Sequence, residues 1–263
     1  MSSGDHDRLF SDGAAYERLM GRWSRLAGEE FISWIQAPKK LRWIDIGCGT
    51  GVFTEEIIKH CGPASVMAID PSVDQIAFAR NRTGAAKAEF RVGDGQELPF
   101  EDDSFDIAVM ALVVHFLPDP SKAMAEIARV LRSGGRAATY VWDYSAGGSP
   151  TAPIVAAVKS LGFESPSPPS PGATSLGALE VLWRLAGFTE LETRVIRIPV
   201  AFADFEKFWD SMTVSVGPAG KAIAKMSADH KEQLRATLQK RFPAGRQVAY
   251  EACANAIKGR LTK

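Results

Sequence analysis

Short apolar runs alternate with amphipathic segments through the first half of the chain. Residues 43–46 form the first run, and residues 52–60 then carry apolar side chains at helical spacing. The alternation continues through four more runs and two more helical segments, at residues 64–70, 73–82, 88–92, 105–112, 121–131 and 136–142. Strands that alternate with helices are typical of a parallel sheet covered by helices on both faces. We therefore predict an α/β, doubly wound fold.

The segments on either side of this region have a different character. Residues 14–26 and 29–36 are amphipathic, and we expect two helices there. We expect this N-terminal region, together with the late helical insertion at residues 202–242, to form a lid over the carboxyl edge of the sheet, where substrate enters. After residue 143 the pattern is interrupted, because residues 145–149 are rich in glycine and serine and residues 165–172 hold four prolines. Such composition predicts irregular loops.

Further elements follow these loops. We predict a helix at residues 175–186, a strand at 191–200, and helices between 202 and 242 with a break at Gly217-Pro218. Residues 247–258 fit a helix or a strand, and we predict a final antiparallel strand because their apolar positions alternate. The alternating residues are Val248, Tyr250, Ala252 and Ala254.

The first strand leads directly into a glycine-rich loop, W-I-D-I-G-C-G-T-G. Gly47, Gly49 and Gly51 have no Cβ atom, so the backbone can adopt positive φ and its N–H groups can approach a ligand. Tight turns also use glycine for purely structural reasons. Asp45 lies inside the apolar run, where a carboxylate costs free energy unless it is hydrogen-bonded or paired. We expect Asp45 to accept backbone N–H bonds from its own loop and to contact a cationic ligand indirectly.

Acidic residues also follow the next two strands. Asp70 ends the run at 64–70, where it can accept hydrogen bonds from both hydroxyls of a ribose. It can equally cap the helix that begins after Pro71. Asp94 lies just past the third strand, in V-G-D-G-Q-E-L-P-F. Nicotinamide enzymes share an acid at the position of Asp70, so this residue alone does not identify the cofactor.

Together these segments resemble the ordered motifs of the class I S-adenosylmethionine-dependent methyltransferases. D-I-G-C-G-T-G matches the first motif of that family, D-x-G-x-G-x-G, and L-R-S-G-G at residues 131–135 is similar to its L-x-P-G-G turn. The resemblance covers residues 16–142 and is closest to the small-molecule group called type 11. It implies a mostly parallel, seven-stranded Rossmann-like sheet with an antiparallel last strand between the fifth and sixth. It also implies S-adenosyl-L-methionine as the cofactor.

The resemblance also implies which residues contact that cofactor. The glycine loop would line its amino-acid portion, Asp70 the ribose, Asp94 and its neighbours the adenine, and the end of the fourth strand the methionine portion. The expected cofactor contacts are Tyr16, Arg22, Asp45, Gly47, Cys48, Gly49, Gly51, Asp70, Pro71, Ser72, Asp94, Gly95, Gln96, Ala111 and Leu112. We expect no metal site.

His115 is the one histidine among these motifs and is the candidate catalytic residue. It can serve as a general base near neutral pH or be an ordinary packed side chain. Methyl transfer often needs no base, because the sulfonium activates the methyl group and the protein mainly aligns an in-line attack. We expect Trp142 and Trp209 to wall a mostly apolar acceptor pocket. The candidate substrate contacts are Trp23, His115, Trp142 and Trp209.

Length and composition indicate the number of domains, the kinds of partner and the cellular location. The 263 residues, 46% of them hydrophobic, are enough for one domain. We divide it into a helical lid at residues 1–38, a cofactor-binding core at 39–143 and a substrate-side elaboration at 144–263. The formal net charge of zero gives no basic field for nucleic acid. The three cysteines, Cys48, Cys61 and Cys253, match neither a disulfide framework nor a zinc site. With no signal peptide and no apolar stretch of membrane-spanning length, we expect a cytoplasmic protein.

These observations predict an enzyme that transfers a methyl group from S-adenosyl-L-methionine to an O, N or C atom of a small, partly apolar molecule. A nicotinamide-dependent oxidoreductase would carry G-x-G-x-x-G, whereas Val52 follows G-C-G-T-G here. A nucleic-acid amino-methyltransferase would carry Asn/Asp-Pro-Pro-Tyr/Phe after the fourth strand, where this chain has A-L-V-V-H-F. A non-catalytic S-adenosylmethionine-binding sensor or partner protein stays open, as do the acceptor and the oligomeric state.

Overall fold

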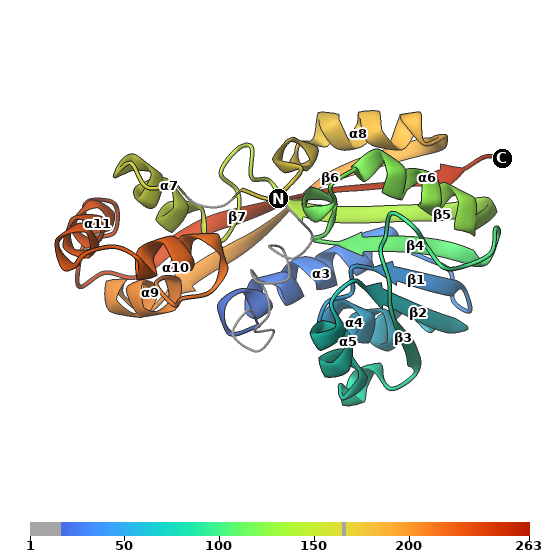
Figure 1. Cartoon of the computed structure of the whole chain (residues 1–263), viewed down its shortest axis with the longest axis horizontal. Helices are drawn as coiled ribbons and strands as arrows, with labels where there is room; N and C mark the ends of the chain where they lie inside the picture. Colours follow the sequence, from blue (N-terminus) through green and yellow to red (C-terminus); the bar gives the residue numbers. More distant parts are fainter. Residues whose placement is uncertain (1–16, 165–166) are drawn as a thin grey trace.

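A computed structural model describes residues 17–164 and 167–263, which build one seven-stranded sheet (Figure 1). The strand order is β3-β2-β1-β4-β5-β7-β6. The parallel strands are β1 (Arg42–Ile46), β2 (Ser65–Asp70), β3 (Ala88–Val92), β4 (Phe105–Ala111) and β5 (Leu131–Trp142). The chain proceeds outward from β1 in one direction and from β4 in the other. The point between them is where open parallel sheets place a ligand crevice, at the carboxyl ends of the strands.

The last two strands are long and antiparallel. β7 (Val248–Leu261) lies between β5 and β6 (Phe188–Phe202) and runs antiparallel to both, which confirms the predicted final strand. Residues 254–260 of β7 pair with β5, whereas residues 248–253 pair with β6 alone. The two strands therefore continue past the carboxyl ends of the parallel strands as a two-stranded ribbon. Pro199 is tolerated in β6 because an edge strand has N–H groups that face away from its neighbour.

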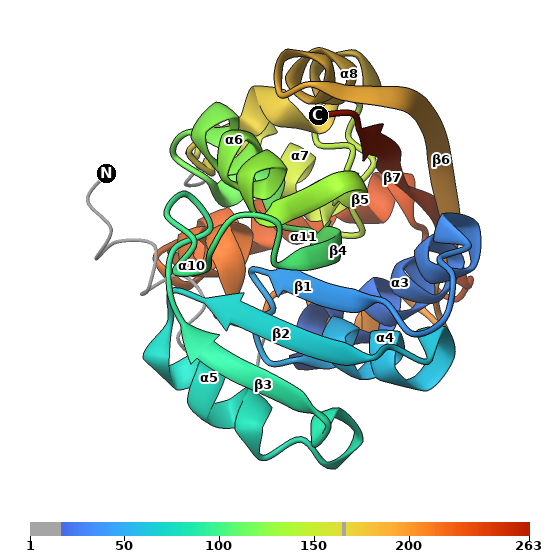
Figure 2. The same ribbon diagram turned by 90° about the vertical axis from the view of Figure 1, so that its right-hand side faces the viewer.

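Helices cover both faces of the sheet (Figure 2). One face carries α3 (Arg22–Ile35), α4 (Val52–Cys61) and α5 (Val73–Arg80), and the other carries α6 (Pro120–Val130) and α8 (Leu176–Leu185). Successive strand residues point to opposite faces. In β1, Trp43 accordingly packs into the core on the α3 side, while Ile44 and Ile46 pack into the core on the α6 side. Burial on both faces explains the nearly unbroken apolar runs of these strands.

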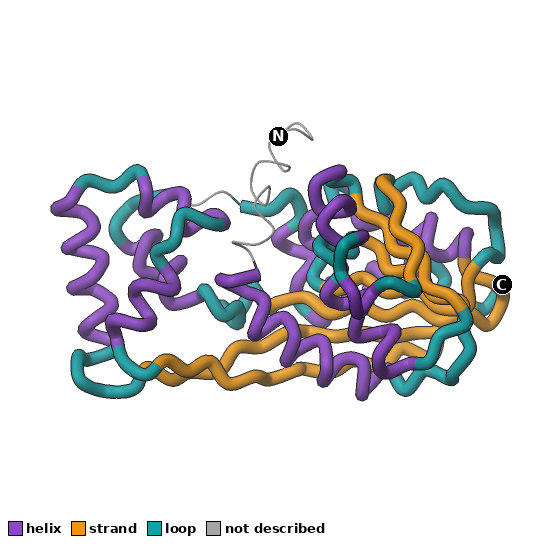
Figure 3. Tube along the Cα trace, turned by 90° about the horizontal axis from the view of Figure 1, so that it is seen from below, coloured by secondary structure: helices purple, strands orange, loops and turns teal. Residues whose placement is uncertain are grey.

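Four helices form a separate group beyond the carboxyl ends of the parallel strands, at the far end of the ribbon (Figures 1 and 3). We call α7, α9, α10 and α11 the helical lobe. Their bounds are Ala152–Ser160, Phe205–Met212, Gly217–Ala224 and Ala228–Arg241. Side-chain caps start two of them: Asp204 Oδ1 accepts from Lys207 N at 2.8 Å, and Ser227 Oγ accepts from His230 N at 3.2 Å. The remaining short turns are η1 (Glu17–Gly21), η2 (Thr83–Ala85), η3 (Val114–Phe116) and η4 (Pro171–Thr174).

The N-terminal region differs from the prediction of two helices over the sheet edge. α3 is one helix that continues through Gly28, where a Cβ atom would lie 3.3 Å from both Phe53 Cδ2 and Tyr140 Oη. Glycine here allows the helix to pack closely against the sheet instead of ending it. α3 belongs to the core of one sheet face, so its body is not a cover over the carboxyl edge.

Two other local predictions were wrong or incomplete. The expected turn at residues 133–135 lies inside β5, as an irregularity where the register shifts between Phe105 opposite Leu131 and Ile107 opposite Arg136. α7 was not predicted at all. Its apolar residues pack against α10 and α11, which are far away in the sequence, so no local pattern indicates this contact.

Candidate cofactor site

The glycine loop after β1 is tied to β2 by its backbone. Gly47 N and Cys48 N both donate to Ile69 O, at 2.7 and 3.0 Å. Gly47, Gly49 and Gly51 have φ of 73°, 53° and 80°, in the left-handed region that favours glycine. The predicted positive φ values are therefore present, and the loop lies at the carboxyl end of β1 as expected.

The three glycines differ in what surrounds them. A Cβ atom on Gly47 would lie 2.5 Å from Val113 Cγ2, and one on Gly51 would lie 3.2 Å from Ala79 Cβ. These two positions need glycine for close packing. A Cβ atom on Gly49 would have its nearest neighbour, Gln75 Oε1, at 3.9 Å. The backbone at Gly49 thus faces open space, which suits close approach by a ligand.

Asp70 connects this loop to the next helix. Its Oδ2 accepts from Gly49 N and its Oδ1 accepts from Ser72 N, both at 2.9 Å. Ser72 in turn caps α5 by accepting from Gln75 N at 3.4 Å, and Pro71 is exposed beside it. A carboxylate offers about four lone-pair sites, so these two bonds are compatible with further acceptance from ribose hydroxyls. The N-cap of α5 is therefore Ser72 and not Asp70, and a ligand contact for Asp70 stays a prediction.

Asp45 is completely buried beneath the loop. Its Oδ2 accepts from Thr54 Oγ1 at 2.6 Å, and its Oδ1 has no hydrogen-bond partner among the described residues. The pKa of Asp45 is raised to about 7, because burial and, to a smaller extent, the charge of Asp70 raise it more than the hydrogen bond from Thr54 lowers it. A positively charged group nearby would favour the ionised form. Thr54, in the first turn of α4, takes the place of the expected backbone partners, and the sequence had not indicated this residue.

The loop after β3 is held together by Gln96. Its Nε2 donates to Asp94 Oδ2 at 3.2 Å, and its Oε1 accepts from Asp119 N at 2.8 Å, at the start of α6. Gly95 lies directly on β1, since a Cβ atom there would be 2.8 Å from Ile46 Cγ2. Asp94 itself is exposed beside this fixed loop. The residues predicted to surround the adenine are thus adjacent to the carboxyl end of β1.

The chain leaves β4 through a strained residue. Leu112 has φ of 64° and donates its N–H to Tyr140 O at 2.8 Å. A bulky side chain rarely adopts this region, and such strain concentrates at functional sites. The turn places Ala111 and Leu112 beside Val113, whose side chain packs against Gly47 of the glycine loop. The loops after β1 and β4 therefore meet, as the resemblance implies for the methionine portion.

His115 lies just beyond, in η3. Only 1% of it is exposed, and its ring centroid is 3.9 Å from that of Phe116 and 5.0 Å from that of Tyr144. Its carbonyl accepts from Ser170 N at 3.0 Å, so the proline-rich segment packs on this turn. The ring is packed among aromatic side chains, and a catalytic role for it stays a prediction.

Other predicted contacts lie elsewhere. Tyr16 falls outside the described residues. Arg22 donates to Ala201 O at 3.2 Å and lies over the rings of Trp23 and Phe202, on the ribbon side of α3. Trp23 is 2% exposed in the same core.

The predicted pair of pocket tryptophans is not placed as expected. Trp142 is 1% exposed and belongs to the core on the α3 side, because its position in β5 turns it toward that face. Trp209 stacks on Phe205 in the helical lobe, and Arg235 Cζ lies 5.3 Å from the centroid of the Trp209 ring. The structure therefore buries Trp142 and does not present it as an open pocket wall.

Two further observations limit the chemistry. Among residues 17–164 and 167–263, no group of three or more His, Cys, Asp or Glu side chains could hold a metal ion. No described helix combines the length and the apolar character that a membrane crossing requires.

Comparison with known proteins finds a family match for part of the chain. Residues 44–139 match the family described as methyltransferase domain. Over 97 residues the chain is 39% identical to 2-methyl-6-phytyl-1,4-hydroquinone methyltransferase 2, chloroplastic, of Oryza sativa subsp. japonica, covering 37% of this chain and 28% of that protein. Over 94 residues it is 37% identical to the fatty-acid O-methyltransferase of Mycolicibacterium smegmatis, covering 36% and 34%. The similarity thus spans about a third of these relatives or less.

Solved structures extend the likeness to the whole fold. The YcgJ protein of Bacillus subtilis superposes with a TM-score of 0.62 at 20% identity, covering 90% of this chain and 98% of that one. The [4+2]-cyclase SpnF superposes with a TM-score of 0.52 at 18% identity, covering 92% and 81%. At such identities the likeness shows the fold alone, and it confirms the seven-stranded, mostly parallel Rossmann-like sheet.

Proposed function

We propose that this protein, whose residues 44–139 match the methyltransferase domain family, binds S-adenosyl-L-methionine and transfers its methyl group to a small, partly apolar acceptor. The acceptor atom is an oxygen, nitrogen or carbon. We further propose that residues 39–143 bind the cofactor and that residues 144–263 supply the substrate side.

One arrangement carries the proposal. Gly49 presents an open backbone position, Asp70 holds that position through the Gly49 N–H, and the buried Asp45 carboxylate lies beneath it with one unpartnered oxygen. An electrostatic environment of this kind favours a cation with hydroxyl groups. The sulfonium, ammonium and ribose groups of S-adenosyl-L-methionine meet both requirements.

The residues of this chain then have separate tasks. When bound, the cofactor supplies a methyl group that its sulfonium has already activated. Asp70 accepts from the ribose, Gln96 keeps the adenine loop rigid, and the strained Leu112 sets the backbone that borders the reacting atoms. The protein therefore contributes mainly by positioning, which accounts for a large share of the rate in such reactions. His115 remains the candidate base if the acceptor must lose a proton.

The acceptor class is supported by the relatives and by the helical lobe. The names of two relatives specify a hydroquinone and a fatty acid, both partly apolar. In this chain the lobe beyond the carboxyl ends is built around apolar side chains, among them Phe205, Phe208 and Met212. A partly apolar acceptor fits an approach between this lobe and the strand ends.

The cofactor assignment is tested by calorimetric titration of S-adenosyl-L-methionine into wild type, Asp70→Asn and Asp74→Asn. Asp74 is an exposed acid in the first turn of α5 and controls for the loss of one nearby charge. We expect Asp70→Asn to weaken binding at least tenfold, because charged hydrogen bonds contribute about 1.5–3 kcal/mol, and Asp74→Asn to bind as wild type does. Equal affinity in all three proteins would refute the assignment.

Transfer is tested separately, with cofactor labelled in its methyl group. Hydroquinones and fatty acids are offered as acceptors, followed by fractionated metabolite extracts. Label in a small-molecule product supports the proposed reaction. Tight cofactor binding without label in any product would indicate the sensor alternative, or a reaction of another kind on the same fold, as the cyclase shows.

A further inference from the structure

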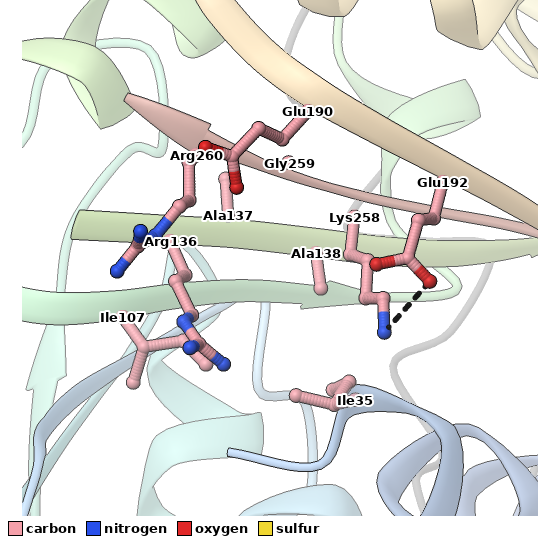
Figure 4. Close-up of a pocket in the computed structure, with 10 residues that line it drawn as sticks. All are labelled: Ile35, Ile107, Arg136, Ala137, Ala138, Glu190, Glu192, Lys258, Gly259 and Arg260. Carbon is pink, nitrogen blue, oxygen red and sulfur yellow. Dashed lines mark ion pairs between the residues drawn. The ribbon is translucent and has the colours of Figure 1, made fainter. Parts of the chain in front are cut away.

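A pocket opens at the amino-terminal edge of the sheet, at the opposite end of the strands from the glycine loop (Figure 4). It lies among the early residues of β4, the middle of β5, the last residues of β7, the start of β6 and the end of α3. Its lining residues include Ile35, Ile107 and Ala138, which give it apolar walls, and Arg136 and Arg260, which extend into it.

The two arginines lie directly opposite each other in the antiparallel register of β5 and β7. Like charges at such a position are destabilising. Arg136 is half-buried and Arg260 is exposed, and among the described residues neither has a carboxylate within 4.0 Å. An arginine cannot relieve this repulsion by losing its proton. The pair therefore lacks the counter-charge that would make it favourable.

The other charges of the pocket do not supply that counter-charge. Lys258 pairs with Glu192 at 3.2 Å and donates to Trp34 O at 3.1 Å, so these two charges neutralise each other and Lys258 also satisfies the end of α3. Glu190 is exposed on the irregular part of β6, where the register shifts between Thr189 and Glu192. Among the lining residues, Glu190 is thus the one carboxylate left to balance the charges of Arg136 and Arg260.

We propose that Arg136 and Arg260 form a binding site for a phosphate-type oxyanion, either free phosphate or the phosphate of a small ester. Each of the two guanidinium groups on this sheet face is a planar fork of N–H donors, and such a fork can bind the oxygens of a phosphate in pairs. This site is separate from the cofactor crevice and does not depend on the proposed function, since Ile107 and Arg136 lie several residues before the carboxyl ends of β4 and β5, which border that crevice.

The test measures binding of inorganic phosphate by thermal unfolding and calorimetry, at constant ionic strength maintained with chloride. The proteins are wild type, Arg136→Gln, Arg260→Gln and the double variant, with Arg184→Gln as control because Arg184 is exposed on α8 over the other face. We expect the single variants to lose several-fold in affinity, the double variant at least tenfold, and the control nothing. Glycerol 3-phosphate is measured in parallel, and tighter binding than phosphate identifies an ester as the ligand.

Glu190→Gln keeps the proposal testable if the double variant does not fold. Removing the one carboxylate that opposes the arginines should raise the affinity for phosphate several-fold, and circular dichroism checks that the variant is folded. The proposal is overturned if wild type gains no stability from phosphate beyond that in chloride. It is equally overturned if the arginine variants gain as much as wild type does, or if Glu190→Gln leaves the affinity unchanged.

Discussion

The two halves of the sheet are built on different principles. β1 to β5 are mostly short parallel strands whose connecting loops are held by specific backbone bonds, such as those from Gly47 N and Cys48 N to Ile69 O. β6 and β7 are long antiparallel strands that carry a helical lobe packed by apolar side chains. The first half restricts which residue can stand at a position, because positive φ or a buried carboxylate admits few choices. The second half accepts many apolar residues of suitable volume. Sequence motifs therefore mark the first half, and the second half is the part that we propose to bind the acceptor.

The largest effect is expected from a proline in the last strand. Ala256 of β7 pairs with Tyr140 of β5 and with Arg194 of β6, so Ala256→Pro removes a ladder bond inside the sheet. We expect a loss of about 3 kcal/mol or more in the free energy of unfolding, measured with urea. The control is Val195→Pro in the edge strand β6, at a position with the same orientation as the native Pro199. If both variants lose equal stability, the second half is not integrated into the sheet as described.

A pair of glycine variants separates packing from ligand approach in the first half. Gly47→Ala combines positive φ with a contact of 2.5 Å to Val113 Cγ2, and we expect a loss of roughly 2–3 kcal/mol in stability. Gly49→Ala has positive φ but open space, so it should lose only about 1 kcal/mol. Its affinity for S-adenosyl-L-methionine should nevertheless fall at least tenfold. Normal affinity in Gly49→Ala would place the ligand elsewhere.

Asp45 makes the stability of the first half depend on pH. Burial raises its pKa from 3.8 to about 7, so the folded state holds this proton more tightly than the unfolded state does. The stabilisation that the folded state gains by holding this proton is fully present below pH 3.8 and is lost as the pH rises through 7. Between pH 5 and 8 we expect wild type to lose roughly 2 kcal/mol relative to Asp45→Asn. Parallel curves of unfolding free energy against pH for the two proteins would contradict this environment for Asp45.

The smallest effect is expected at the surface of the helical lobe. Glu206 of α9 pairs with Arg235 of α11, whose guanidinium also lies 5.3 Å from the rings of Phe205 and Trp209. Glu206→Gln should cost only about 0.2–1 kcal/mol, as is usual for an exposed pair. The difference should shrink in 1 M salt, which screens such charges. A loss above 2 kcal/mol would show that the lobe depends on a specific ion pair more than on apolar packing.

The same contrast explains what could be predicted from sequence. The first six strands, the glycine loop and the positions of Asp70 and Asp94 followed from residues whose local chemistry leaves few alternatives. The antiparallel last strand followed from the alternation at residues 248–254 together with the family resemblance. The expected break between the helices at 14–26 and 29–36 was wrong, because the role of Gly28 depends on Phe53 and Tyr140, which contact it only in the folded chain. The burial of Trp142 and the existence of α7 likewise depend on partners far away in sequence.

The position of β7 between β5 and β6 has a consequence for folding during synthesis. β7 is the sole neighbour of β6 in the described sheet, yet it follows β6 along the chain after the whole segment 203–247. As the ribosome synthesises the chain, the parallel strands can assemble first. β6 then has both of its edges unpaired until β7 has been synthesised. Exposed strand edges invite pairing with other chains. The interval between the synthesis of residue 202 and that of residue 261 is therefore when this protein is most open to aggregation and most in need of a chaperone.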